Sequence, residues 1–164
     1  MNWKLITPIT TVKIGRALWI TLIPHEFETP KGKYTVPAGF LFDHASVPPI
    51  FTNIVHPVKS CLGEASLLHD YFYCKESPDV SRKFADEGLK YLTLNTGKMS
   101  KKKDKIIAHL AYRGVRIGSK KFYNKKYNAE KIVDAYKPFK EMGIEALKEK
   151  FIISLEIMPD FNFC

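Results

Sequence analysis

A histidine, a carboxylate and a phenol lie close together in Leu67-Leu-His-Asp-Tyr-Phe-Tyr73, a run that otherwise has the composition of a buried helix. At helical spacing His69 and Tyr73 lie one turn apart on one face, with Asp70 beside them. Burying a His–Asp pair among leucines and aromatic residues costs free energy unless the polar atoms find partners or a metal. The run therefore predicts either a hydrolytic or metal site, or a hydrogen-bonded network that is only structural.

Two further carboxylates are candidates for the same site. Asp43 follows the short extended run 38–42 and precedes a proline-stiffened loop, where a carboxylate is held rigidly while its oxygens stay accessible. Asp86 lies on the next predicted helix and would face His69 if the two helices pack as an antiparallel hairpin. A carboxylate on one imidazole nitrogen fixes the tautomer and makes the other nitrogen a better base or ligand. We therefore expect Asp43, His69, Asp70 and Asp86 to form the catalytic set.

Two chemistries fit this set, and both need a divalent metal ion whose identity the sequence leaves open. In the first, Asp43, His69 and Asp70 bind a metal that activates water. In the second, His69 is the general base, Asp86 orients it, and Asp70 holds a hard cation such as calcium. The second arrangement is similar to the catalytic helix pair of secreted phospholipases A2. The glycine-rich calcium loop and the disulfides of that family are absent here, so the likeness is local.

The same residues also have structural interpretations. Arg82 and Asp86 are spaced as an i, i+4 ion pair on a helix. Asp43 can cap a turn before Ser46, and His69 can hydrogen-bond to a backbone carbonyl. The spacing alone does not separate these interpretations from a reactive site.

Composition bounds the fold and the partners. The 164 residues, 45% of them hydrophobic, suit one domain with its own core. The formal net charge of +9 favours an acidic partner, such as nucleic acid, an anionic envelope polymer or an acidic protein. The three cysteines, Cys61, Cys74 and Cys164, lack the count and spacing of a disulfide framework or a zinc site, which favours a reducing compartment. Neither a signal peptide nor a membrane span is expected.

Strand and helix signals occupy different parts of the chain. The first sixty residues predict short strands, among them 17–23, 38–42 and a hairpin of 27–29 with 34–37 around a turn at Pro30 and Gly32. Helices are predicted from Gly63 to about 74, from a Ser77-Pro78 cap to about 94, from a Ser100 cap to Gly118, and over 128–136 and 138–150. In the third helix, core positions are expected at Ile106, Leu110 and Ile117. The predicted class is α+β, with N-terminal antiparallel strands and hairpins followed by a helical, bundle-like half.

Basic residues are concentrated between Lys98 and Lys126. In the second part of this segment lysines alternate with Phe122, Tyr123 and Tyr127. Basic residues mixed with aromatic ones can bind phosphates and stack on bases, which makes nucleic acid an alternative partner. The other interpretation is a solvated lysine face with the aromatic side chains in the core.

Four ordered motifs resemble one family. They are Val36-Pro-Ala-Gly-Phe-Leu-Phe-Asp-His-Ala-Ser-Val-Pro48, the His69-Asp70 helix, Ser81-Arg-Lys-Phe-Ala-Asp86 and Tyr112-Arg-Gly-Val-Arg-Ile-Gly118. The family is a small domain of unknown function that is widespread in tailed bacteriophages and prophages, and the resemblance covers about residues 3 to 123. It implies a phage α+β domain over 1–124. Residues 125–164 would then be a lysine-rich helical extension packed on the same domain.

The resemblance also marks positions for the site. The recurring polar positions of the family fall here on Asp43, Ser46, His69, Asp70, Tyr73, Arg82 and Asp86. Ser46, Tyr73 and Arg82 are the expected substrate-binding residues. His44 stands where the family usually has an apolar residue, and no established reaction carries over.

Three functions remain open. The first is a phage-encoded, metal-assisted hydrolase that acts on a host envelope or another anionic polymer. The second is a virion or tail-associated assembly protein that works with other phage structural proteins and has no catalysis. The third is a small effector that binds a host protein or nucleic acid through the Lys98–Lys126 region. All three imply the host cytoplasm or the virion as the location.

Overall fold

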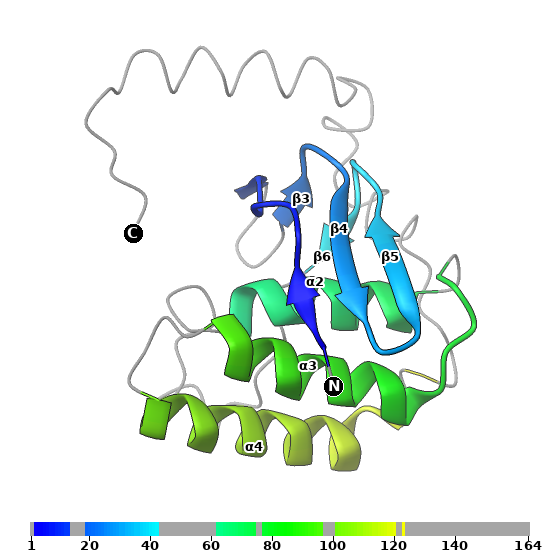
Figure 1. Cartoon of the computed structure of the whole chain (residues 1–164). Helices are drawn as coiled ribbons and strands as arrows, with labels where there is room; N and C mark the ends of the chain where they lie inside the picture. Colours follow the sequence, from blue (N-terminus) through cyan, green and yellow to red (C-terminus); the bar gives the residue numbers. More distant parts are fainter. Residues whose placement is uncertain are drawn as a thin grey trace.

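The strands precede the helices, as the sequence predicts, and the α+β class is confirmed (Figure 1). The computed structural model describes residues 2–13, 19–42, 62–74, 77–96, 101–120 and 123. Within these ranges the strands are β1 (Lys4–Leu5), β2 (Thr11–Lys13), β3 (Trp19–Thr21), β4 (His25–Thr29), β5 (Gly32–Val36) and β6 (Leu41–Phe42), and the helices are α2 (Leu62–Tyr73), α3 (Arg82–Thr96) and α4 (Lys101–Gly118). None of these three helices is long and apolar enough to cross a bilayer. The helices expected over 128–136 and 138–150, and with them the extension 125–164, lie outside the described residues.

The strands form two small antiparallel sheets, in the orders β1-β4-β5 and β2-β3-β6. The predicted hairpin is the β4–β5 pair, in register from His25 opposite Val36 to Thr29 opposite Gly32. Gly32 has a φ of 115°, a conformation that side chains rarely tolerate. The Thr29 hydroxyl closes the turn, because it donates to the Gly32 carbonyl and accepts from the Lys31 amide. Thus the turn residues set the register that buries one face of β4.

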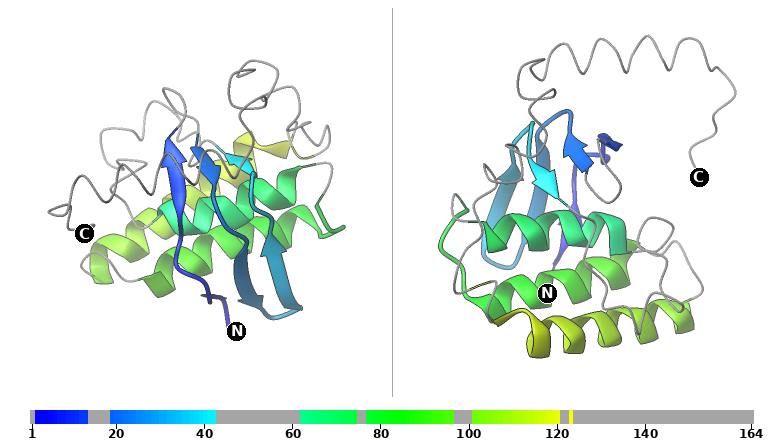
Figure 2. Two further views of the ribbon diagram at one scale, coloured as in Figure 1. Left: turned by 90° about the horizontal axis from the view of Figure 1, so that it is seen from above. Right: turned by 180° about the vertical axis from the view of Figure 1, so that it is seen from behind.

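The helices lie side by side in the order α2, α3, α4, so α3 is the middle helix (Figures 1 and 2). α2 also packs against β5 and β6, and α3 against β1. The core between sheet and helices is aromatic: the Phe72 ring lies 5.0 Å from that of Tyr34 and 5.9 Å from that of Phe84. Leu67 and Leu68 of α2 fill the remaining space and are fully buried. The sheet therefore fixes α2 and α3, and α4 packs on the outer side of α3.

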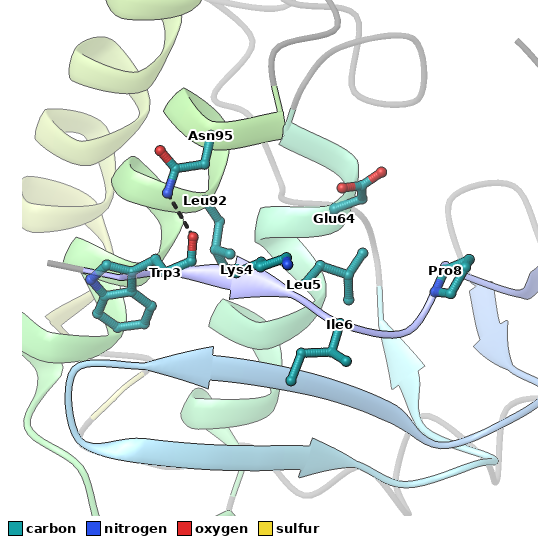
Figure 3. Close-up of a pocket in the computed structure, with 8 residues that line it drawn as sticks. All are labelled: Trp3, Lys4, Leu5, Ile6, Pro8, Glu64, Leu92 and Asn95. Atoms are coloured by element: carbon teal, nitrogen blue, oxygen red, sulfur yellow. Dashed lines mark hydrogen bonds between the residues drawn. The ribbon is translucent and has the colours of Figure 1, made fainter.

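The N-terminal strand is held by α3. The Trp3 ring lies 4.7 Å from that of Phe84, and the Asn95 amide donates to the Trp3 carbonyl oxygen at 2.6 Å (Figure 3). Trp3 also helps to line a pocket of about 310 Å³ beside β1. A β-carbon on Gly88 would lie 2.8 Å from Cζ3 of Trp3. Gly88 therefore leaves the space on α3 that the indole ring occupies.

The predicted start of the second helix is wrong. The cap is Ser81 rather than Ser77, because the Ser81 hydroxyl accepts a hydrogen bond from the Phe84 amide at 3.2 Å. Ser77 instead donates to the Cys74 carbonyl at 2.8 Å, beside the end of α2. A serine before proline is typical of a helix cap, but the hydroxyl of Ser77 is already bonded to a carbonyl beside the end of the previous helix.

The predicted core face of α4 is wrong at two of its three positions, whereas Leu110 is partly buried. Ile106 is 52% exposed and Ile117 is 85% exposed, whereas Ile107 and Ala108 are buried. The inward-facing stripe consists of the buried residues Asp104, Ile107 and Ala108 and the partly buried residues Ala111 and Val115, and it also has helical periodicity. It was not recognised because it begins with a carboxylate and contains small residues. The two isoleucines therefore belong to the outer face.

Gly88→Ala should destabilise the protein by about 1–3 kcal/mol, because the new methyl group overlaps a buried indole whose backbone is anchored. Urea unfolding measures the change. Gly114→Ala is the matched control: a β-carbon there meets nothing within 4 Å, so alanine should stabilise helix α4 by about 0.5–1 kcal/mol. Equal effects of the two substitutions would contradict this packing.

Candidate functional site

A buried carboxylate, Asp86 on α3, lies at the centre of the candidate site. Its Oδ1 atom accepts from the Tyr73 hydroxyl at 2.6 Å and from Nε2 of His69 at 3.1 Å. Its Oδ2 atom accepts from Nη1 of Arg116 at 2.8 Å. The donors come from α2 and α4, the two helices that flank α3. All three described helices therefore meet at this carboxylate.

The two ring nitrogens of His69 have unequal partners. Nε2 faces Asp86, which is fully buried. Nδ1 faces Oδ1 of Asp70 at 3.5 Å, at the long limit of hydrogen bonding. The Asp70 side chain is 14% exposed, whereas the His69 side chain is only 7% exposed. Nδ1 therefore has the weaker partner of the two nitrogens, and Nε2 is the one that is firmly held.

The charges of the cluster balance. Burial opposes the charged form of His69, but hydrogen bonds and charge from Asp70 and Asp86 raise its pKa to about 9. Burial also opposes ionisation of Asp86, but hydrogen bonds from His69, Tyr73 and Arg116 hold the pKa of this carboxyl below its usual range. At neutral pH two carboxylates thus face two cations, His69 and Arg116. Burial and the neighbouring Asp86 charge raise the pKa of Tyr73, so its hydroxyl remains a donor.

An outer ring of contacts ties the ends of the helices together around this cluster. Oγ of Ser119 lies 2.6 Å from the Tyr73 hydroxyl. Nη1 of Arg82 donates to the Arg116 carbonyl at 3.1 Å, which places a cation at the C-terminal end of α4, where the helix dipole favours it. The Tyr123 ring packs edge-on against that of Tyr73, with centroids 5.2 Å apart. The start of α3 and the end of α4 are thereby fixed beside His69.

The structure brings together four residues singled out from the sequence, namely His69, Asp70, Tyr73 and Asp86. The expected contact between His69 and Asp86 is observed. Arg82 is adjacent, but the predicted ion pair with Asp86 is wrong, because Arg116 forms it instead. Asp43 and Ser46 lie outside the described residues, and so does His44. The pocket beside β1 is lined by none of these residues.

The expected metal ligands are only partly described. Asp70 and His69 are adjacent, whereas Asp43, the third expected ligand, lies outside the described residues. Across the part of the chain that the structure describes, no group of three or more His, Cys, Asp or Glu side chains is arranged to hold a metal. Among the described residues, Asp70 offers a carboxylate that is both partly exposed and next to His69, which suits a hard cation.

Sequence reasoning missed Arg116 and Ser119. Arg116 occurs only within the motif 112–118, where it is given no role, and Ser119 is not singled out; charge balance is the signal that could have pointed to a further cation. A carboxylate on a buried helix face needs a cation, and histidine alone cannot supply it at high pH. Arg116 is one of two arginines on the third helix, and helical spacing does not tell which of them points inward.

Comparison with known proteins gives one family. A model of the family described as "Protein of unknown function (DUF1353)" matches residues 19–115, more than half of the chain. No curated protein and no solved structure matches the chain. The matched segment contains His69, Asp70, Tyr73 and Asp86, and Arg116 lies one position beyond it.

The free energy of unfolding should decrease as the pH rises from about 6.5 to about 9. The folded protein binds the His69 proton more tightly than the unfolded chain, whose pKa is 6.5. The resulting stabilisation is complete below pH 6.5 and is lost as the pH passes 9. At about 1.4 kcal/mol per tenfold change in proton affinity, the loss is about 3 kcal/mol. Urea unfolding at several pH values across this range measures the loss. In His69→Gln the free energy of unfolding should vary much less with pH. A free energy that does not vary with pH in the unaltered protein would contradict the raised pKa of His69.

Proposed function

The chain belongs to this family of proteins of unknown function, and we propose that it is a metal-assisted hydrolase that acts on an anionic polymer. His69 is the general base, Asp86 orients it, and Asp70 is a ligand of the divalent cation. One observation carries the proposal: Asp86 fixes Nε2 of His69, while Nδ1 points at a partly exposed carboxylate.

The orientation of His69 supports this role. Tyr73 and Arg116 hold both oxygens of Asp86, so the carboxylate cannot turn away from the imidazole. Once a cation bound at Asp70 has lowered the pKa of His69, a carboxylate held at Nε2 would keep the remaining proton on that nitrogen and leave the lone pair on Nδ1. A base oriented in this way accepts a proton from a water molecule that attacks the substrate. The pair of His69 and Asp86 therefore provides an oriented base for general-base catalysis.

Asp70 would link the base to the cation. In the arrangement described, its carboxylate helps to hold His69 protonated at neutral pH. A cation bound by Asp70, with Asp43 as the expected second ligand, would neutralise this carboxylate and supply a positive charge for the substrate oxygen. The positive charge of the chain, +9, suits an anionic polymer such as a host envelope component. A phage origin, which the sequence motifs suggest, is part of the proposal.

A second candidate function is a virion or tail-associated assembly role without catalysis. The observation that favours it is the burial of His69 and Asp86: the whole His69 residue is 6% exposed and Asp86 is fully buried. A buried, charge-balanced network can serve to fix three helices and nothing more. The two candidate functions differ in whether a divalent cation stabilises the folded protein.

Calcium or magnesium, added singly, should raise the melting temperature of the protein, and a chelator should reverse the shift. A cation at a hundred times its dissociation constant stabilises by about 2.7 kcal/mol. Asp70→Asn should abolish the shift, and Asp79→Asn, which alters an exposed carboxylate elsewhere, should preserve it.

His69→Gln should lower hydrolysis of cell-wall or other anionic polymers by at least about 100-fold. If neither cation shifts the melting temperature and no polymer is cleaved, the assembly role replaces the hydrolase.

A further inference from the structure

The outer face of α4 carries exposed basic residues in its first turns and again near its C-terminal end. The exposed residues on it are Lys102, Lys103, Lys105, Ile106, His109, Arg113 and Ile117, and the exposed Lys120 follows two positions after the end of the helix. Helix α4 is the outermost of the three helices, and its other face packs on α3 (Figures 1 and 2). We refer to the basic members, Lys102, Lys103, Lys105, Arg113 and Lys120, as the α4 basic face.

The cations of the α4 basic face have no carboxylate partners among the residues that the structure describes. Asp104, the one acidic residue of α4, is 2% exposed and lies on the side facing α3. By contrast, Lys83 on α3 lies 3.9 Å from Glu87. Like charges at neighbouring positions on a helix repel one another, and an anionic partner would remove this cost.

The dimensions of the face suit an extended polyanion. A helix of this length is about 27 Å long at about 1.5 Å per residue. A nucleic-acid duplex carries a negative charge about every 1.7 Å along its axis, so several phosphates fall within that span. We propose that the α4 basic face binds the sugar-phosphate backbone of a nucleic-acid duplex, without reading the bases. This proposal does not depend on the hydrolase.

Other occupants fit the face less well. Single strands bind by stacking bases on exposed aromatic rings, and the aromatic residue of α4, Tyr112, is only partly exposed and lies under the Lys90 ammonium. Membrane insertion needs a contiguous apolar strip, whereas Ile106 and Ile117 are eleven positions apart with Arg113 between them. Unpaired cations spread over one side of a helix, with scattered apolar residues between them, are most complementary to the phosphates of a duplex.

The test compares two triple charge reversals that change the net charge equally. The first is Lys102→Glu, Lys105→Glu and Arg113→Glu on the α4 basic face. The control is Lys4→Glu, Lys13→Glu and Lys33→Glu, all exposed residues on the strands. A third variant replaces the same α4 residues with glutamine. Circular dichroism and the melting temperature confirm that each variant folds, and Lys102→Glu places a favourable charge in the first turn of α4.

Fluorescence anisotropy with a duplex of about 20 base pairs, at salt concentrations from about 50 to 200 mM, gives the affinity and its salt dependence. The α4 variants should lose at least tenfold in affinity, and the slope of log K against log salt should become shallower by about three. The strand control should keep the slope of the unaltered protein. The proposal is overturned by equal losses in both triple variants, by no duplex binding at low salt, or by tighter binding to polyglutamate or to anionic lipid vesicles.

Discussion

A carboxylate buried between helices has to be neutralised where it lies, and the arrangement of the helical half follows from this requirement. Removing Asp86 from water costs several kcal/mol unless charges and hydrogen bonds compensate for it. Tyr73 and His69 approach from α2, and Arg116 approaches from α4. No single helix supplies all the donors. The carboxylate on the middle helix therefore fixes the positions of the two helices that flank it.

The sheet and the N-terminal strand determine where α3 itself lies. Trp3 packs against α3 at Gly88, two residues after Asp86, and Asn95 anchors the Trp3 backbone. Aromatic packing from β5 onto Phe72 fixes α2 in the same way. These two contacts between strands and helices bring α2 and α3 close together, and the hydrogen bonds of Asp86 with His69 and Tyr73 then fix their relative positions. This explains how a small domain holds an imidazole with its two nitrogens in different environments.

Local sequence signals predicted much of the fold. The hairpin followed from Pro30 and Gly32, and the contact of His69 with Asp86 followed from helical spacing and the assumption of a helix pair. The errors arose where the local sequence fits two alternatives equally well. Ser77 and Ser81 both resemble caps, and both faces of α4 carry apolar residues at helical spacing.

Arg116 was missed for a different reason. Its role depends on which face of α4 meets α3, and that is decided by packing between segments thirty residues apart. Local sequence carries no information on this choice, since Arg113 and Arg116 lie on the same helix in similar surroundings. The structure turns Arg116 toward Asp86 and leaves Arg113 exposed. Helix α4 thereby supplies a cation to the buried site and presents others on its outer face.

The central claim is that the buried charge of Asp86 is held by a cation from α4, and the most direct test is the loss of unfolding free energy caused by Arg116→Gln beside Arg113→Gln. Both substitutions remove one positive charge from the same helix. We expect a loss of about 2 kcal/mol for Arg116→Gln, because a hydrogen bond to a buried charge is removed. We expect a change within about 0.5 kcal/mol for Arg113→Gln, which alters only an exposed side chain. Equal, small changes in both variants would show that Asp86 does not depend on Arg116, and they would contradict the account.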